Sequence, residues 1–251
     1  MENIVIKEDY KLPSRGKVYK GINVNPEVSI TSMTTEHEMR RLSHTDTPYK
    51  NMAEIIDECL ITKPGITSYD MCFGDYQYLL HKLRVVTYGP IYKIDTICPY
   101  CGTINSKEIN LDELEVKEYT EDLSNLFEIK LPKTGKTVTL KMQTPRMLDK
   151  ISQRVKEMNK KAPDMKGDPS ILYTLESIID KVDGELLDEV KLGNFVRKLP
   201  MMDTNYILKT AEKLNSKVGV NTEIENICSV CGVDYKTTFP ITSEFFGPSI
   251  D

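Results

Sequence analysis

The sequence has no tryptophan, only six cysteines and no long apolar run. No stretch approaches the roughly 18 consecutive apolar residues that a membrane-spanning helix requires. The N-terminal residues mix acidic and basic side chains and lack the apolar segment of a signal peptide. We therefore expect no association with a membrane and a protein that stays in the cytoplasm where it is made, in which thiols remain reduced.

Recognisable catalytic motifs are also missing. The three histidines form no His-Glu-x-x-His pattern, and the chain has no serine nucleophile elbow or glycine-rich dinucleotide loop. The segment KTGKT (residues 133–137) invites comparison with a phosphate-binding loop, but Lys130 stands where that pattern requires glycine. Strand-like residues flank the segment on both sides, which favours a hairpin turn. The sequence thus predicts no enzymatic activity and no small-molecule substrate.

The charge balance is mildly acidic. The chain has 33 lysines and arginines against 38 acidic residues, a net charge of −5. A protein whose main partner is nucleic acid normally presents a basic surface, so this balance disfavours nucleic acid as the partner. A nucleic-acid-binding zinc ribbon is kept as the alternative function, although the residues flanking the cysteine motifs include Asp95, Glu108, Glu223 and Glu225.

Four of the cysteines occur in two copies of the same motif, ICPYCG from Ile97 and ICSVCG from Ile227. The two-residue gap allows both sulfurs of a motif to bind one ion, and the following glycine allows a tight turn. Two such knuckles supply the four thiolates of a structural zinc site. Zinc is favoured over an iron–sulfur cluster, which four thiolates also permit, and over two unrelated reduced pairs or a redox dithiol. The predicted metal ligands are Cys98, Cys101, Cys228 and Cys231.

A closed site of four thiolates leaves no coordination position open for water or substrate. We therefore expect the metal to be structural, joining the last strands of the chain to its middle. The remaining cysteines, Cys59 and Cys72, lie on or beside apolar helical faces and are predicted to be buried free thiols.

Changes in hydrophobic period divide the chain into regions. Strand patterns flank both knuckles, alternating apolar residues around a turn at 133–135 predict a β-hairpin, and a helical pattern covers about 145–214. We expect an α+β fold: a mainly helical body with short antiparallel strands, a hairpin and a zinc-ribbon-like module built from the two distant knuckles. The predicted regions are an extended N-terminal arm (1–30), an N-terminal helical region (31–90), the first knuckle and hairpin (91–142), a helical block (143–216), and the second knuckle with the C-terminal tail (217–251).

The two ends of the chain carry separate predictions. The N-terminal arm is polar, rich in lysine and broken by Pro13 and Gly16, so we expect it to have little core of its own and to order against a partner. Near the other end, Phe245 and Phe246 either fold back onto the core or anchor in a partner protein, and the sequence leaves both arrangements open.

Several segments occur in a suggestive order: LPSRGKVY near the N-terminus, TTEHEMRRL at a helix start, GDYQYLLHKLRVVTYG leading into the first knuckle, and FPITSEFF after the second. This order resembles the baseplate hub proteins of contractile-tailed, T-even-like bacteriophages, a family that covers a hub subunit and a hub assembly protein. The resemblance implies a non-enzymatic protein that helps to build the hub at the tip of the phage tail. It further implies that the partners are other phage baseplate hub and tail proteins, and that the protein is found in the virion and, during assembly, in the host cytoplasm.

Overall fold

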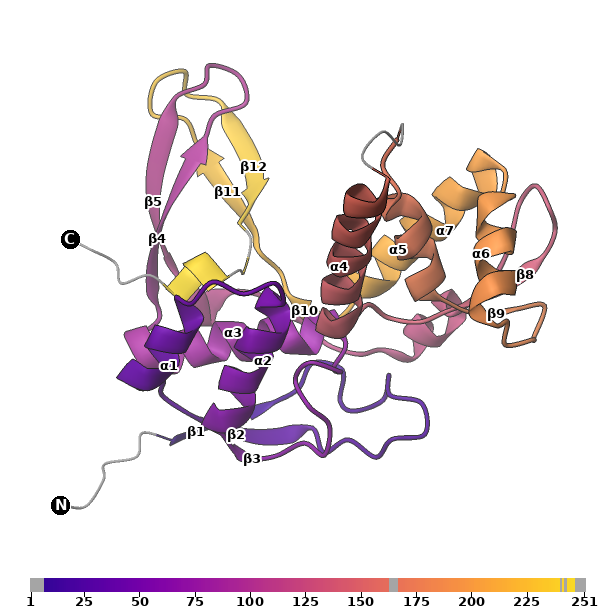
Figure 1. The fold of residues 1–251 in the computed structure, drawn as a ribbon. Helices are drawn as coiled ribbons and strands as arrows, with labels where there is room; N and C mark the ends of the chain where they lie inside the picture. The colour runs from indigo at the N-terminus through magenta and orange to yellow at the C-terminus, as the bar shows by residue number, and fades with distance from the viewer. Residues whose placement is uncertain (1–6, 163–166, 240, 242, 247–251) are drawn as a thin grey trace.

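The computed structural model describes residues 7–162, 167–239, 241 and 243–246. Helices and short antiparallel strands build the fold, which confirms the predicted α+β class. Figure 1 shows three parts: a first body, a ribbon arm that projects from it, and a second, mainly helical body. None of the helices described is both long and apolar enough to cross a membrane.

The first body packs helices against one three-stranded antiparallel sheet (Figure 1). The central helix, α3, has its apolar residues buried on nearly all sides and ends at Gly89, whose φ of 86° is available to glycine without strain. The elements of this body are β1 (Lys7–Lys11), β2 (Glu27–Thr31), β3 (Leu60–Thr62), α1 (Thr35–Arg41), α2 (Pro48–Cys59), α3 (Phe73–Tyr88), and the 3-10 turns η1 (Leu111–Glu113) and η3 (Ser243–Phe246).

The N-terminal segment is part of this body. β1 pairs with β2, and Leu12, Val24 and Val28 are buried in the first core. In the loop between these strands, the buried Ser14 donates its backbone N–H to the carboxylate of Asp75 on α3, at 2.9 Å. The prediction that this segment has little core of its own and orders against a partner is therefore wrong for the described residues, because most of its apolar side chains pack into the core of this body, although Ile22 is exposed. Residues 1–6 of the predicted arm lie outside the described residues.

The second body arranges four helices around another three-stranded sheet. The hairpin predicted around residues 133–135 is confirmed as β7 and β8. The elements of the second body are η2 (Glu121–Leu126), β7 (Glu128–Lys130), β8 (Thr137–Leu140), α4 (Pro145–Lys161), α5 (Ser170–Ile178), β9 (Ile179–Val182), α6 (Glu189–Arg197) and α7 (Met201–Asn215).

Strand β9 differs from the sequence prediction, which has a series of helices over about 145–214 with breaks at 168–169 and 199–200. Ile179 and Val182 are buried, and β9 pairs antiparallel with β8. A short apolar run fits a buried strand as well as a helix. The free edge of β8 decides between them, because pairing there satisfies backbone groups that a continued helix would leave open.

The turn of the β7–β8 hairpin is closed by a carboxylate. Asp203, in the first turn of α7 and fully buried, accepts the backbone N–H groups of Lys133 and Thr134 at 2.7 and 3.0 Å. These are amides of the kind that a phosphate-binding loop would direct at its ligand. The KTGKT segment is thus a hairpin turn whose amides are already bonded, as predicted from its flanks.

The two bodies meet where the start of α3 crosses β10 (Gly219–Val220), which pairs with β6 (Val116–Lys117). The crossing is very close: a Cβ on Gly74 would lie 2.1 Å from the carbonyl oxygen of Val218. Gly219 adds a φ of +120°, which other residues rarely adopt. Glycine is therefore required on both sides of this contact.

The ribbon arm consists of two antiparallel hairpins from distant parts of the chain, β4 (Ile91–Ile97) with β5 (Ile104–Asn110) and β11 (Glu223–Ile227) with β12 (Asp234–Thr238). Figure 1 shows them side by side, projecting away from the first body. At the base of the arm, Ile94, Ile109 and Ile224 join the first core, so the arm is anchored there by apolar contacts.

The C-terminal segment η3 folds back onto the same core. Phe245 and Phe246 are 1% and 0% exposed, which decides in favour of core packing over anchoring in a partner. The fully buried Arg84 of α3 holds the segment by donating to the carbonyl oxygen of Phe245 at 3.2 Å and to that of Gly89 at 2.8 Å. Its guanidinium also lies 5.1 Å from the centroid of the Tyr92 ring, within cation–π range.

Candidate metal centre

Each hairpin of the arm turns through a knuckle with the same backbone geometry. In the first, the N–H of Gly102 donates to the carbonyl of Cys98 at 2.9 Å, and in the second the N–H of Gly232 donates to Cys228 at 2.9 Å. Both glycines have positive φ, 74° and 69°. The glycine that follows each Cys-x-x-Cys pair therefore serves the tight turn, as the sequence predicted.

The two knuckles bring all four predicted cysteines together. The Sγ atoms lie within 4.8 Å of one another. Cys98 Sγ lies 3.7 Å from Cys231 Sγ, and Cys101 Sγ lies 3.5 Å from Cys228 Sγ, so the close contacts join different knuckles. A tetrahedral zinc ion with bonds of about 2.3 Å would set its sulfurs about 3.8 Å apart. The four thiols could therefore hold one metal ion without rearrangement.

Backbone and hydroxyl groups lower the pKa of two of these thiols, Cys228 and Cys101. At Cys231 the backbone N–H of Val233 is outweighed by desolvation and by hydrogen bonds with the other thiols, which raise its pKa to about 12. The backbone N–H groups of Cys231 and Val230 point at the Cys228 sulfur and lower the pKa of that thiol to about 6. Hydrogen bonds with the hydroxyl and the backbone N–H of Thr103 also lower the pKa of Cys101. Because a thiol must lose its proton to bind a metal, both effects favour binding at neutral pH.

Behind the sulfurs, a polar network joins the two hairpins. The Tyr235 hydroxyl of β12 lies 2.7 Å from Thr96 Oγ1 of β4. The Asn105 side chain of β5 accepts the backbone N–H of Ser229 at 2.9 Å and points its amide towards Cys228 Sγ, 3.9 Å away. These groups fix the position of the second knuckle relative to the first, as outer partners do around metal ligands.

The sequence reasoning missed this network. The one feature of the sequence that indicates this network is the alternation of inward and outward side chains along the strands. Thr96 and Asn105 occupy inward positions of their strands, where an ordinary hairpin would place apolar side chains. Polar residues at inward positions next to a knuckle could have been read as supports for the cysteines.

Apart from its base, the arm has almost no apolar core. The only cluster of buried residues found there, among those that the structure describes, consists of Cys98, Cys228 and Tyr235. Two-stranded hairpins are marginal in water unless a further contact stabilises them. The four cysteines lie at the end of the arm, where the two hairpins have no apolar core to hold them together.

The arm is acidic overall. Over residues 91–110 and 223–238 it carries three lysines against five acidic residues, a formal charge of −2. Lys236 is already paired with Glu223 at 2.9 Å and with Glu225 at 3.1 Å. Such a surface is unsuited to the phosphate contacts on which nucleic-acid binding depends.

The other two cysteines are buried, as predicted: Cys59 is 0% and Cys72 2% exposed. Cys59 Sγ lies 3.8 Å from Nδ1 of His37, whose Nε2 contacts Glu58 at 3.2 Å, an order that resembles a catalytic triad. Burial, however, raises the pKa of Cys59 to about 12, and His37 Nδ1 already accepts the backbone N–H of Thr34 at 3.0 Å. His37 therefore serves to cap α1, and Cys59 offers no reactive thiolate.

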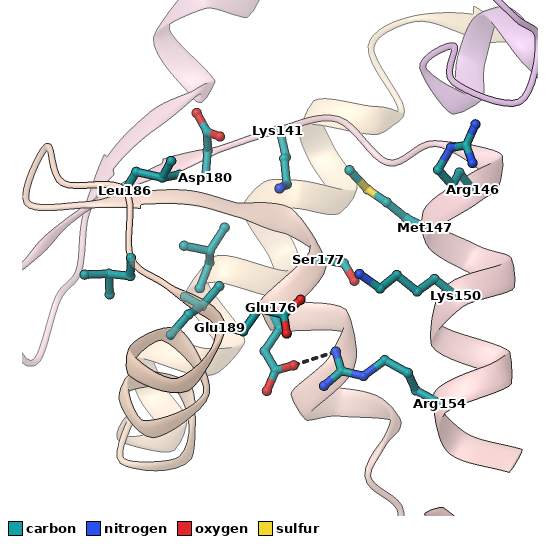
Figure 2. Close-up of a pocket in the computed structure, with 13 residues that line it drawn as sticks. Lys141, Arg146, Met147, Lys150, Arg154, Glu176, Ser177, Asp180, Leu186 and Glu189 are labelled. Atoms are coloured by element: carbon teal, nitrogen blue, oxygen red, sulfur yellow. Dashed lines mark ion pairs between the residues drawn. The ribbon is translucent and has the colours of Figure 1, made fainter. Parts of the chain in front are cut away.

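The second body contains a cavity of about 340 Å³ between α4 and the α5–β9–α6 segment (Figure 2). Arg154 of α4 spans it to the carboxylate of Glu176, 2.7 Å away. The hydroxyl of Ser177 donates to the carbonyl of Tyr173 at 2.7 Å. Among the described residues that line the cavity, no nucleophile is paired with a base.

Comparison with known proteins connects this architecture to phage tails. Residues 4–247, nearly the whole chain, match the model of the family described as T4 bacteriophage base plate protein. Neither the curated proteins nor the solved structures gave a match. The match covers both bodies and both knuckles, and it confirms the resemblance to phage baseplate proteins that the order of sequence motifs indicated. The chain therefore belongs to the T4 bacteriophage base plate protein family.

Proposed function

We propose that this protein is a non-enzymatic component of the baseplate hub, acting as a subunit or as an assembly protein, and that a zinc ion bound by Cys98, Cys101, Cys228 and Cys231 fixes its ribbon arm. Its partners are other hub and tail proteins of the phage. It is located in the virion tail and, during assembly, in the host cytoplasm. The proposal rests on the membership of the baseplate family together with the structural character of the four-thiol site.

One observation carries the zinc assignment: four thiols come together in space from two knuckles that are far apart in the sequence, with the whole second body between them along the chain. Zinc accepts four thiolates in a tetrahedron with no preference imposed by d-electrons, and the spacing of the sulfurs fits this geometry. With all four positions filled by protein, the ion would bind no water or substrate. Its contribution is to hold the second hairpin against the first.

The zinc assignment is tested by metal analysis of protein purified without chelator. We expect about one zinc per chain, and loss of zinc in Cys98→Ser. The matched controls are Cys59→Ser and Cys72→Ser, which remove buried thiols outside the arm and should leave the metal content unchanged. Absence of metal from the unmodified chain, or iron with sulfide in its place, would contradict the assignment.

The hub assignment is tested separately, by isolating baseplates and hub subassemblies from infected cells. Mass spectrometry should find the chain together with the other hub proteins, either in finished baseplates if it is a subunit or only in precursors if it is an assembly protein. Its presence solely with the peripheral parts of the baseplate would contradict a hub role while leaving the family membership intact.

A further inference from the structure

Large apolar side chains are exposed together at the tip of the ribbon arm. These residues have between 38% and 71% of their surface exposed, although they belong to residue types that are usually buried. Figure 1 shows the knuckles at the end of the arm that points away from both bodies. The tip residues are Ile97, Tyr100, Ile104, Ile227, Val230 and Val233.

The fold does not require apolar side chains at these positions. Ile97 and Ile104 are paired across β4 and β5 but lie on the outward face, since their neighbours Thr96 and Asn105 are the buried ones. Within each motif the only side chains that the metal and the turn require are those of the cysteines, with glycine after them. Both knuckles nevertheless place an apolar side chain, Tyr100 or Val230, just before the second cysteine. Clustered apolar residues with no role in folding mark an interaction surface.

The charges around the tip indicate which partner it fits. A groove beside it has an apolar part formed by Pro99, Tyr100 and Ile227, and its charged lining residues are Lys107, Glu225, Asp234 and Lys236. Among the described residues, no cation lies within ion-pair distance of Asp234 or of Asp95, whose carboxylate accepts only the Ser106 hydroxyl at 2.5 Å. Two of the arm's three lysines are engaged: the Nζ of Lys107 donates to a backbone carbonyl, and Lys236 is held by two glutamates. The third, Lys93, lies nearer the base of the arm, where it is paired across the hairpin with Glu108.

We propose that the tip of the ribbon arm is a docking surface for another baseplate protein, one that presents an apolar surface bordered by lysine or arginine. The partner's place in the baseplate rests on the function proposed above. A second copy of this chain fits less well, because a symmetric contact would bring two acidic tips together, and like charges oppose association. Four bound thiolates would add further negative charge at the tip and favour a basic partner still more.

The contact is tested by photo-crosslinking within assembling phage. A photoreactive amino acid is placed at Val230 and, as the matched control, at Leu186 of the second body, which is equally exposed at 76% against 71%. We expect irradiation to link position 230 to one other baseplate protein, through a peptide that carries lysine or arginine, and position 186 to give no such product. A link from position 230 to a second copy of this chain, or no link at all, would overturn the proposal.

Substitution gives an independent test. Tyr100→Ser with Val230→Ser removes apolar surface and keeps the cysteines, and the recovery of this variant in baseplate complexes should fall about tenfold or more. Leu186→Ser should be recovered normally. An unchanged protease digestion pattern and metal content would exclude misfolding of the arm. If the unmodified chain is found in baseplates and the tip variant is recovered equally well, the docking surface is wrong and the proposed function stands; if the unmodified chain occurs in no baseplate complex, the proposed function itself fails.

Discussion

The first body and the ribbon arm reach order by different means. The first body is built on one buried cluster of 25 described residues, which includes residues of α3 and the C-terminal phenylalanines and to which the base of the arm contributes only Ile94, Ile109 and Ile224. Beyond its base, the only hydrophobic cluster that the described residues of the arm form consists of Cys98, Cys228 and Tyr235, and two of these are thiols of the candidate metal centre. A cluster this small cannot offset the entropy of ordering four strands. A helical body can be sustained by apolar burial, whereas a thin projecting ribbon requires a cross-link.

The largest effect is expected from removing one metal ligand. Structural zinc contributes about 10–16 kcal/mol of apparent binding free energy in small peptides, against about 5–15 kcal/mol for the stability of a whole domain. Cys228→Ser should therefore lose the metal, release the second hairpin from the first and abolish incorporation into hub complexes. Far-UV circular dichroism should still show most of the helical signal, because the helices lie outside the arm. A variant without metal that assembles normally would show that the cross-link is dispensable.

The converse change damages the body and spares the arm. Leu79 of α3 is fully buried in the first core, and Leu79→Ala should lower the free energy of unfolding by about 2–5 kcal/mol through lost burial and the cavity left behind. Urea denaturation measures this loss. The folded fraction of the variant should retain its full metal content. Metal loss in step with the loss of stability would mean that arm and body are one cooperative unit.

Lowering the pH should affect the arm and leave the helical bodies folded. The pKa of Cys228 lies at about 6, below the ordinary value for a thiol, so its thiolate is favoured above that pH and is lost as the pH falls through it. Protons compete with the metal for the sulfur. Metal should therefore leave the arm as the pH falls below about 6, while the helical circular dichroism signal persists. Release of metal on raising the pH from about 7 to about 9 would contradict this sign.

The smallest effect is expected in the network behind the sulfurs. Tyr235→Phe removes the hydroxyl that bonds Thr96 of the opposite hairpin and keeps the buried ring. One such bond contributes about 0.5–1.5 kcal/mol, so the variant should still bind metal but exchange it faster with a competing chelator. Tyr100→Phe, at an exposed position of the same arm, is the matched control. Equal exchange rates in the two variants would show that the network does not support the site.

Local sequence rules predicted what depends on spacing. The two Cys-x-x-Cys-Gly motifs led to the correct cluster of four thiols, and the alternation around residues 133–135 led to the β7–β8 hairpin. Each knuckle and the hairpin turn are specified within a few residues of chain, and the repetition of the cysteine motif pointed to the pairing of the two knuckles. The division of the chain into five regions stays a prediction.

Tertiary contacts decided the remainder. The sequence predicts helix at β9 because a short apolar run does not distinguish a buried strand from a buried helix. The partner that makes it a strand, β8, lies about 40 residues earlier in the chain. The sequence predicts little core in the N-terminal segment because the segment is polar, rich in lysine and broken by Pro13 and Gly16. Its contacts with distant residues, among them the bond from Ser14 to Asp75 of α3 and the packing of Leu12 and Val24 in the first core, are not visible in the local sequence. The role of Asp203 could not be foreseen either, since its partners lie some 70 residues away.

Hydrogen–deuterium exchange, measured by mass spectrometry before and after a strong chelator removes the metal, compares the arm and the bodies in one experiment. If the cross-link orders the arm, peptides from β4, β5, β11 and β12 should lose most of their protection when the metal is removed, while peptides from α3 in the first core and α7 in the second keep theirs. Unchanged protection throughout the arm would show that the ribbon is stable without the metal, and uniform loss across the chain would show that the bodies depend on it as well. Either result would contradict the assignment of the four cysteines as a local clip.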